Sequence, residues 1–167
     1  MRFKRIMLFL VLSLLLCETR FLCGQYKALR NIGSEFKIII ADFPIKEDAK
    51  KIGLTEERLR IAAELRLRRE GITIIDEYSR EIPVVYVSIN VVGPAYNINL
   101  MICELVELKR LPPPHWTTVG VWVQTITGTH GGHYEEIVSS LNILFDEFFN
   151  DYYKANPKEK KEVRSWN

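Results

Sequence analysis

The residue types and motifs that carry much of protein chemistry are scarce in this sequence. Its 167 residues include three cysteines and three histidines. No GxSxG, HExxH or paired CxxC motif occurs, which counts against the commonest hydrolase and redox mechanisms. Internal repeats and low-complexity linkers are absent as well, so the length predicts one domain with a substantial core. Catalysis is therefore not the function that the sequence favours.

The first residues are typical of an export signal. A basic start (Met1 to Arg5) precedes an uninterrupted apolar run from Ile6 to Leu16. That run is too short to span a bilayer and too apolar for a surface helix, so residues 1–24 are predicted to be a signal peptide cleaved near Gly24. Lipidation at Cys17 or an uncleaved amino-terminal anchor are the alternatives, although Leu16 is larger than a lipobox allows at that position.

The slight excess of positive charge belongs to this leader. Residues 1–24 hold four of the 23 basic residues and one of the 21 acidic residues, so the remainder carries a net charge of −1. No basic surface for nucleic acid is therefore expected. Cleavage also removes Cys17 and Cys23. The remaining Cys103 stands in an apolar strand, where it is predicted to be a small buried residue and not a nucleophile.

One helix and the strand after it give the clearest pattern. Thr55 is a good N-cap for a helix ending before Gly71, which is predicted to adopt the left-handed conformation. The predicted apolar stripe of this helix is Leu59, Ala62, Ala63 and Leu67, widened by Leu65. Arg66 falls inside that stripe. It either pairs with Glu70 on its own helix, or holds a carboxylate from the sheet or a ligand.

The other elements alternate as strands do. Strands are predicted at residues 36–43, 72–78, 84–92, 96–108 and 117–127, and a second amphipathic helix at 134–155. Three consecutive prolines, 112–114, predict a stiff connector between the last two strands. Neither helix can bury its stripe alone. The predicted fold is thus an α+β two-layer sandwich over residues 25–157, with the element order β-α-β-β-β-β-α. Its sheet is expected to be mainly antiparallel, with about five strands, and both helices are expected to cover one face of it. Residues 158–167 form a charged tail that is expected to be flexible.

The segment Gly128 to Glu136 (GTHGGHYEE) is the most suggestive for chemistry. Backbone N–H groups before a helix are able to bind an anion, but the segment lacks the lysine of a P-loop. His130 and His133, with nearby glutamates, are candidate zinc ligands; a flexible turn with surface histidines is the ordinary alternative. Asp146, Glu147 and Asp151 are predicted to lie on the solvated face of the last helix. No catalytic residue, metal or cofactor is assigned.

Four stretches resemble an uncharacterised family of small secreted bacterial proteins: AELRLRREGITII, YVSINVVG, TTVGVW and, most distinctively, FFNDYYKANP. The resemblance implies export and no assigned activity. The element order is also similar to the TolB amino-terminal domain and to the lipopolysaccharide-assembly lipoprotein LptE, which is an analogy of layout alone.

These features together predict an exported periplasmic or envelope-associated protein without enzymatic activity. It would bind another protein or an envelope component through its exposed sheet face or an edge strand, with membrane contact only through the leader or a lipid on Cys17. Two alternatives stay open: a metal- or anion-binding enzyme centred on residues 128–133, and an LptE-like outer-membrane assembly lipoprotein.

Overall fold

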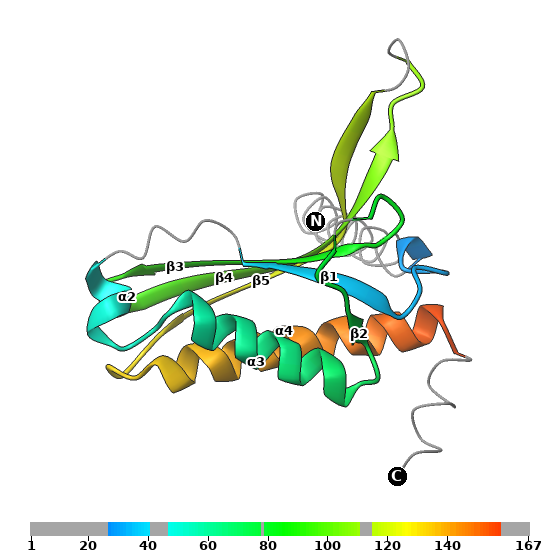
Figure 1. Ribbon diagram of the computed structural model, residues 1–167. Helices are drawn as coiled ribbons and strands as arrows, with labels where there is room; N and C mark the ends of the chain where they lie inside the picture. Colours follow the sequence, from blue (N-terminus) through cyan, green and yellow to red (C-terminus); the bar gives the residue numbers. More distant parts are fainter. Residues whose placement is uncertain (1–26, 41–46, 78, 111–114, 158–167) are drawn as a thin grey trace, which may run out of the picture.

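The computed structural model describes residues 27–40, 47–77, 79–110 and 115–157. It contains a five-stranded mixed sheet and three helices, which confirms the predicted α+β sandwich. Both long helices lie on the same side of the sheet (Figure 1). The leader, the triple-proline connector and the charged tail fall outside the described residues, so the predictions about them stay predictions.

The sheet has the strand order β2-β1-β3-β4-β5. The strands are β1 (Glu35–Ile40), β2 (Thr73–Ile74), β3 (Val84–Val92), β4 (Ala95–Glu107) and β5 (Trp116–Thr129). The first strand β1 pairs in parallel with both β2 and β3, whereas β3, β4 and β5 form a continuous antiparallel meander. The predicted strand at 72–78 is much shorter than expected, since only its first residues pair with β1.

The helices cover one face because each has one apolar stripe. Helix α3 (Glu56–Arg69) packs on β1 and β2, and α4 (Tyr134–Ala155) packs on β4 and β5. The predicted Thr55 cap is confirmed: its hydroxyl accepts from the Arg58 N–H at 3.2 Å. Gly71 has the predicted positive φ, 77°. Leu65, however, was wrongly placed in the stripe. It is 51% exposed, because the stripe that meets the sheet is narrower than the sequence suggested.

Alternation along the strands separates the two faces of the sheet. The buried side chains of β1, β3 and the first part of β4 meet the helices, as predicted, and Trp122 of β5 joins them with no exposed surface. The short helix α2 (Glu47–Lys51) was not predicted. Ala49 is its only buried residue, and one buried residue gives no periodic apolar pattern. Asp48 connects the helix to the sheet, because its carboxylate accepts from the Gly93 N–H at 2.9 Å.

Strands β4 and β5 extend beyond the rest of the sheet as a projecting hairpin (Figure 1). Their register shifts between Ile102 and Cys103, where Val121 is the extra residue of a β-bulge. A bulge bends and twists a strand pair. The hairpin beyond it, Cys103–Glu107 with Trp116–Gly120, therefore leaves the sheet on the side opposite the helices.

Candidate interaction surface

The face of the sheet opposite the helices carries two rows of neutral polar side chains. The strand register aligns one residue from each of β3, β4 and β5 in each row. The rows are Ser88–Asn99–Thr125 and Asn90–Asn97–Thr127, called the polar rows below. Hydrogen bonds tie them together: the Asn97 amide donates to Thr127 Oγ1 at 3.0 Å, and the Thr125 hydroxyl donates to Asn99 Oδ1 at 2.7 Å. Each of these side chains is exposed or partly exposed.

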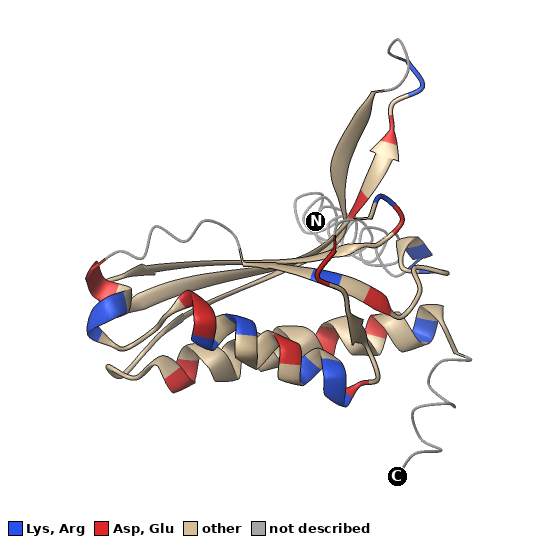
Figure 2. Ribbon diagram, in the orientation of Figure 1, with Lys and Arg blue, Asp and Glu red and all other residues tan. Residues whose placement is uncertain are grey.

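Charged residues are absent from this part of the sheet. All of β3, all of β5 and β4 as far as Ile102 contain neither acidic nor basic side chains. Figure 2 shows the contrast: the described charges gather on the helices, the loops, β1 and the projecting hairpin, while the central strands carry none. Because a quarter of the whole chain is charged, this neutral area is a specific feature of the fold.

The glycine-histidine loop is ordered by its own protein contacts. His130 Nε2 lies 3.0 Å from the Gly93 carbonyl and donates to it, while Nδ1 accepts from the Gly132 N–H at 3.2 Å. Both ring nitrogens of His130 are thus engaged, which fixes the tautomer with its proton on Nε2. The Gly131 N–H donates to the Glu136 carboxylate at 2.6 Å, so a side chain of this protein occupies the position that an anion would take. His133 is the N-cap of α4, and its side chain makes no capping hydrogen bond.

Cys103 is buried, as predicted, with 7% of its surface exposed. It lines a cavity of about 210 Å³ at the base of the projecting hairpin, together with Ile39, Ile82, Tyr86 and other residues. Burial raises the pKa of the Cys103 thiol. The group therefore stays protonated near neutral pH, which is the opposite of what a nucleophilic cysteine requires.

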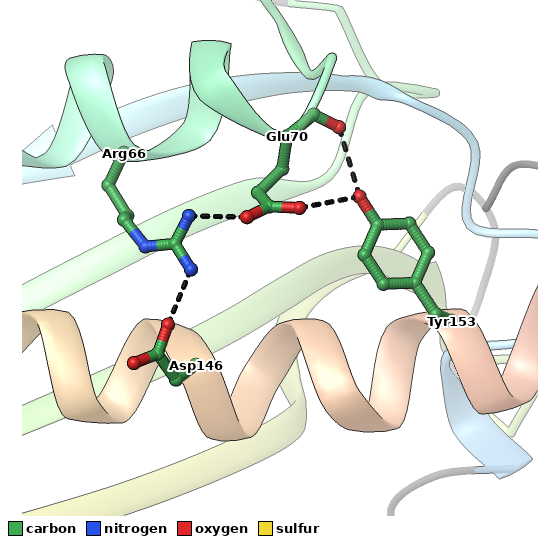
Figure 3. A network of polar contacts seen from close by, with 4 residues as sticks. All are labelled: Arg66, Glu70, Asp146 and Tyr153. Atoms are coloured by element: carbon green, nitrogen blue, oxygen red, sulfur yellow. Dashed lines mark hydrogen bonds and ion pairs between the residues drawn. The ribbon is translucent and has the colours of Figure 1, made fainter. Parts of the chain in front are cut away.

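A half-buried arginine and its partners join the two long helices (Figure 3). The Arg66 guanidinium binds Glu70 at 2.6 Å and also pairs with Asp146 of α4, and it lies over the Phe149 ring at 5.0 Å. Burial alone would lower the pKa of Arg66, but the hydrogen bonds and charges of the two carboxylates outweigh it and raise the pKa. Tyr153 donates to Glu70 Oε2 at 3.0 Å, and burial followed by that bond raises its pKa.

Both interpretations of Arg66 are thereby resolved. It does pair with Glu70, and its second carboxylate comes from the neighbouring helix instead of the sheet or a ligand. Asp146 and Glu147 are exposed, in agreement with the predicted solvated face, although Asp146 also binds Arg66. Asp151 is only partly exposed and accepts from the Trp122 indole at 3.2 Å. Sequence spacing placed these carboxylates mostly opposite the apolar stripe, but it could not show which residues of the neighbouring elements they contact. Since all partners in this cluster satisfy one another, it stabilises helix packing.

Asn156, just after α4, was not singled out by the sequence, although it lies in the distinctive FFNDYYKANP stretch. It is buried, and its Oδ1 accepts from the Asn31 N–H at 2.8 Å while its Nδ2 donates to the Leu29 carbonyl at 2.8 Å. Tyr152 donates to the Gly33 carbonyl at 2.7 Å. These two residues fasten the chain entering β1 onto the end of α4.

The chain matches no protein-family model, no curated protein and no solved structure at a significant level. Within the described ranges, no group of three or more histidine, cysteine, aspartate or glutamate residues is arranged to hold a metal ion. None of the helices in that same part of the chain has the length and apolar character needed to cross a membrane. The fold and its neutral sheet surface are therefore the grounds for a functional conclusion.

Proposed function

We propose that this protein is an exported, non-enzymatic binding module of the bacterial envelope, and that its neutral sheet surface is the site where another protein binds. That surface consists of the polar rows and the adjoining strand β5. The observation that carries the proposal is the absence of charged side chains from β3, β5 and β4 as far as Ile102.

Burial energetics support a contact at this surface. Charged side chains are expensive to desolvate and are depleted from the centres of protein–protein interfaces. A sheet face that meets only water has no such restriction and commonly carries lysine and glutamate. Neutral hydroxyls at this surface remain accessible to a partner, since the Thr125 and Thr127 side chains are exposed.

The compartment rests on the leader. A signal peptide over residues 1–24 would deliver the domain across the inner membrane, and no cysteine pair would be needed for its stability there, since Cys103 is buried and free. Mass spectrometry of the mature amino terminus separates cleavage near Gly24 from lipidation at Cys17.

Site-specific photocrosslinking in the producing cell tests the proposed function. A photoreactive amino acid replaces Ser88 on the neutral face, and in a matched control it replaces Glu57 on the outer surface of α3. The expected result is a discrete adduct of reproducible mass from position 88 and none from position 57. Equal crosslinking from both positions, or none from position 88, contradicts the proposal.

A further inference from the structure

We infer that β5 binds an extended segment of the partner protein as a sixth strand of the sheet, and that this segment carries basic residues at alternate positions. The inference rests on the proposed function and deepens it by naming the mode of contact and the chemistry of the partner. Three observations carry it: the free backbone groups of β5, the contrast between the two edges of the sheet, and the acidic flank of α4.

The backbone groups of β5 alternate between its two sides. The His130 N–H donates to the Pro94 carbonyl at 2.8 Å. In the register of this antiparallel pair, His130 and every second residue before it in β5 therefore form backbone hydrogen bonds with β4. The intervening residues of β5 point their N–H and C=O groups away from β4. Val123, Thr125 and Thr127 are the central ones, and no described strand lies on that side of them. An incoming strand would find a regular row of donors and acceptors there.

The two edges of the sheet differ in their protection. Natural edge strands avoid unwanted pairing by being short, or by carrying charges, prolines or bulges. At the opposite edge, β2 has only two paired residues and is followed closely by Asp76 and Glu77. Strand β5 spans 14 residues without a charged residue or a proline, and the bulge at Val121 is its only feature that discourages pairing. The stretch from Trp122 to Thr129 is therefore an edge left open to pairing.

The flank of α4 beside β5 is net acidic: it carries Glu147, Asp151 and one lysine, Lys154, which pairs with Asp151 at 3.2 Å. Asp151 contacts Trp122 of β5, whereas Asp146 contacts Arg66 of α3, so these two residues mark opposite flanks of the helix. Glu147 lies one helical turn before Asp151, and Ile143 one turn before that; both are exposed, Ile143 by 47%. The flank nearest the open edge thus presents Ile143, the Glu147 carboxylate and the Asp151–Lys154 pair.

This geometry specifies the partner segment. Successive side chains of an added strand point alternately to the two faces of the sheet. Those on the helix side would lie beside Glu147 and Asp151, where lysine or arginine is complementary. Those on the other side would extend the polar rows, where threonine, serine, asparagine or valine fits. A second copy of this chain is disfavoured, because pairing β5 with β5 around a two-fold axis would set Glu147 and Asp151 against the same acids.

Binding of two defined peptides tests the inference. The probes are an eight-residue peptide alternating lysine with threonine or valine, and its counterpart with glutamate in place of lysine. Isothermal titration gives the affinities, and amide shifts in the ¹⁵N-labelled protein give the site. The lysine peptide is expected to shift the amides of Val123, Thr125 and Thr127 and to bind at least tenfold more tightly than the glutamate peptide.

Three variants sharpen the test. Thr125→Pro removes one outward N–H without touching the β4 ladder and should weaken lysine-peptide binding about fivefold, as expected for one lost hydrogen bond. Its matched control Thr125→Val loses the same hydroxyl bond to Asn99 but keeps that N–H, so it should bind about fivefold more tightly than Thr125→Pro. Glu147→Lys, at an exposed helical position, should abolish the preference for the lysine peptide, whereas Glu57→Lys on α3 should not.

Several outcomes overturn strand addition. They are no binding of the lysine peptide at millimolar concentration, amide shifts confined to the polar-row residues of β3 and β4, and equal affinity of the Thr125→Pro and Thr125→Val proteins. Shifts in β5 that depend on protein concentration would report self-association and overturn it as well. The proposed function fails separately. It fails when position 88 gives no adduct. An adduct from position 88, together with no binding of the lysine peptide, would mean that the neutral surface binds a partner by another mode.

Discussion

Replacing Asn156 by alanine is expected to destabilise the fold far more than its position after the last helix suggests. Its side chain makes three hydrogen bonds, to the Asn31 N–H and to the Leu29 and Tyr152 carbonyls, at 2.8, 2.8 and 3.1 Å. Each intramolecular hydrogen bond contributes about 1 kcal/mol net. Because Asn31 lies near solvent and regains water, we expect Asn156→Ala to lower the free energy of unfolding by roughly 2–3 kcal/mol.

Urea unfolding followed by circular dichroism measures this effect. With a slope typical of a small domain, the midpoint should fall by about 1 M or more. Asn150→Ala is the matched control, since Asn150 is an exposed residue of the same helix and its replacement should leave the midpoint nearly unchanged or raise it slightly. If the two variants unfold at the same urea concentration, Asn156 does not fasten the start of the chain to α4, and the reasoning is refuted.

Three further predictions concern packing, charge and the thiol. In Gly128→Ala a new Cβ would lie 2.5 Å from the hydroxyl of the buried Tyr96. The free energy of unfolding in the same urea assay should therefore fall by about 2–3 kcal/mol, and an unchanged value would contradict that contact. Arg66→Met should lower the free energy of unfolding by about 1–2 kcal/mol. Arg60→Met, the control in an exposed ion pair, should lower it by less than about 0.5 kcal/mol, and equal losses would contradict a half-buried network. Native Cys103 should react with iodoacetamide at least about tenfold more slowly than the denatured chain. Burial raises the pKa of Cys103, so the neutral thiol stabilises the fold fully below the ordinary thiol pKa, and this stabilisation is lost as the pH rises through the raised pKa. Cys103→Ala should therefore remove that loss of stability at alkaline pH. If the free energy of unfolding of both proteins depended on alkaline pH in the same way, the reasoning about burial would be contradicted.

The elements with a strong period were predictable from the sequence. The bounds of β3 and α4 agree with the prediction, because each has a regular apolar face that meets one neighbour. The N-cap at Thr55 and the left-handed conformation of Gly71 were also predictable from the sequence, since both depend on the local backbone. The parallel pairing of β1 with its two neighbours was not predicted, because strand order depends on contacts between distant residues.

The interaction surface was only partly predictable. Alternation identified which side chains of β3, β4 and β5 share a face, but the polar rows appear only once the register is known. The acidic flank of α4 could not be divided into a side facing α3 and a side facing β5 without knowing which helix each carboxylate meets. The role of Asn156 was hidden for a similar reason: its partners Leu29 and Asn31 lie more than 120 residues away.

We propose that a protein partner covers the neutral sheet surface in the envelope. Carbene footprinting compares side-chain labelling of the protein in its native envelope with labelling of the purified protein. We expect reduced labelling of Val123, Thr125 and Asn99 in the envelope, and unchanged labelling of Glu56 and Glu57 on α3. Equal labelling of the sheet surface in both states would contradict it.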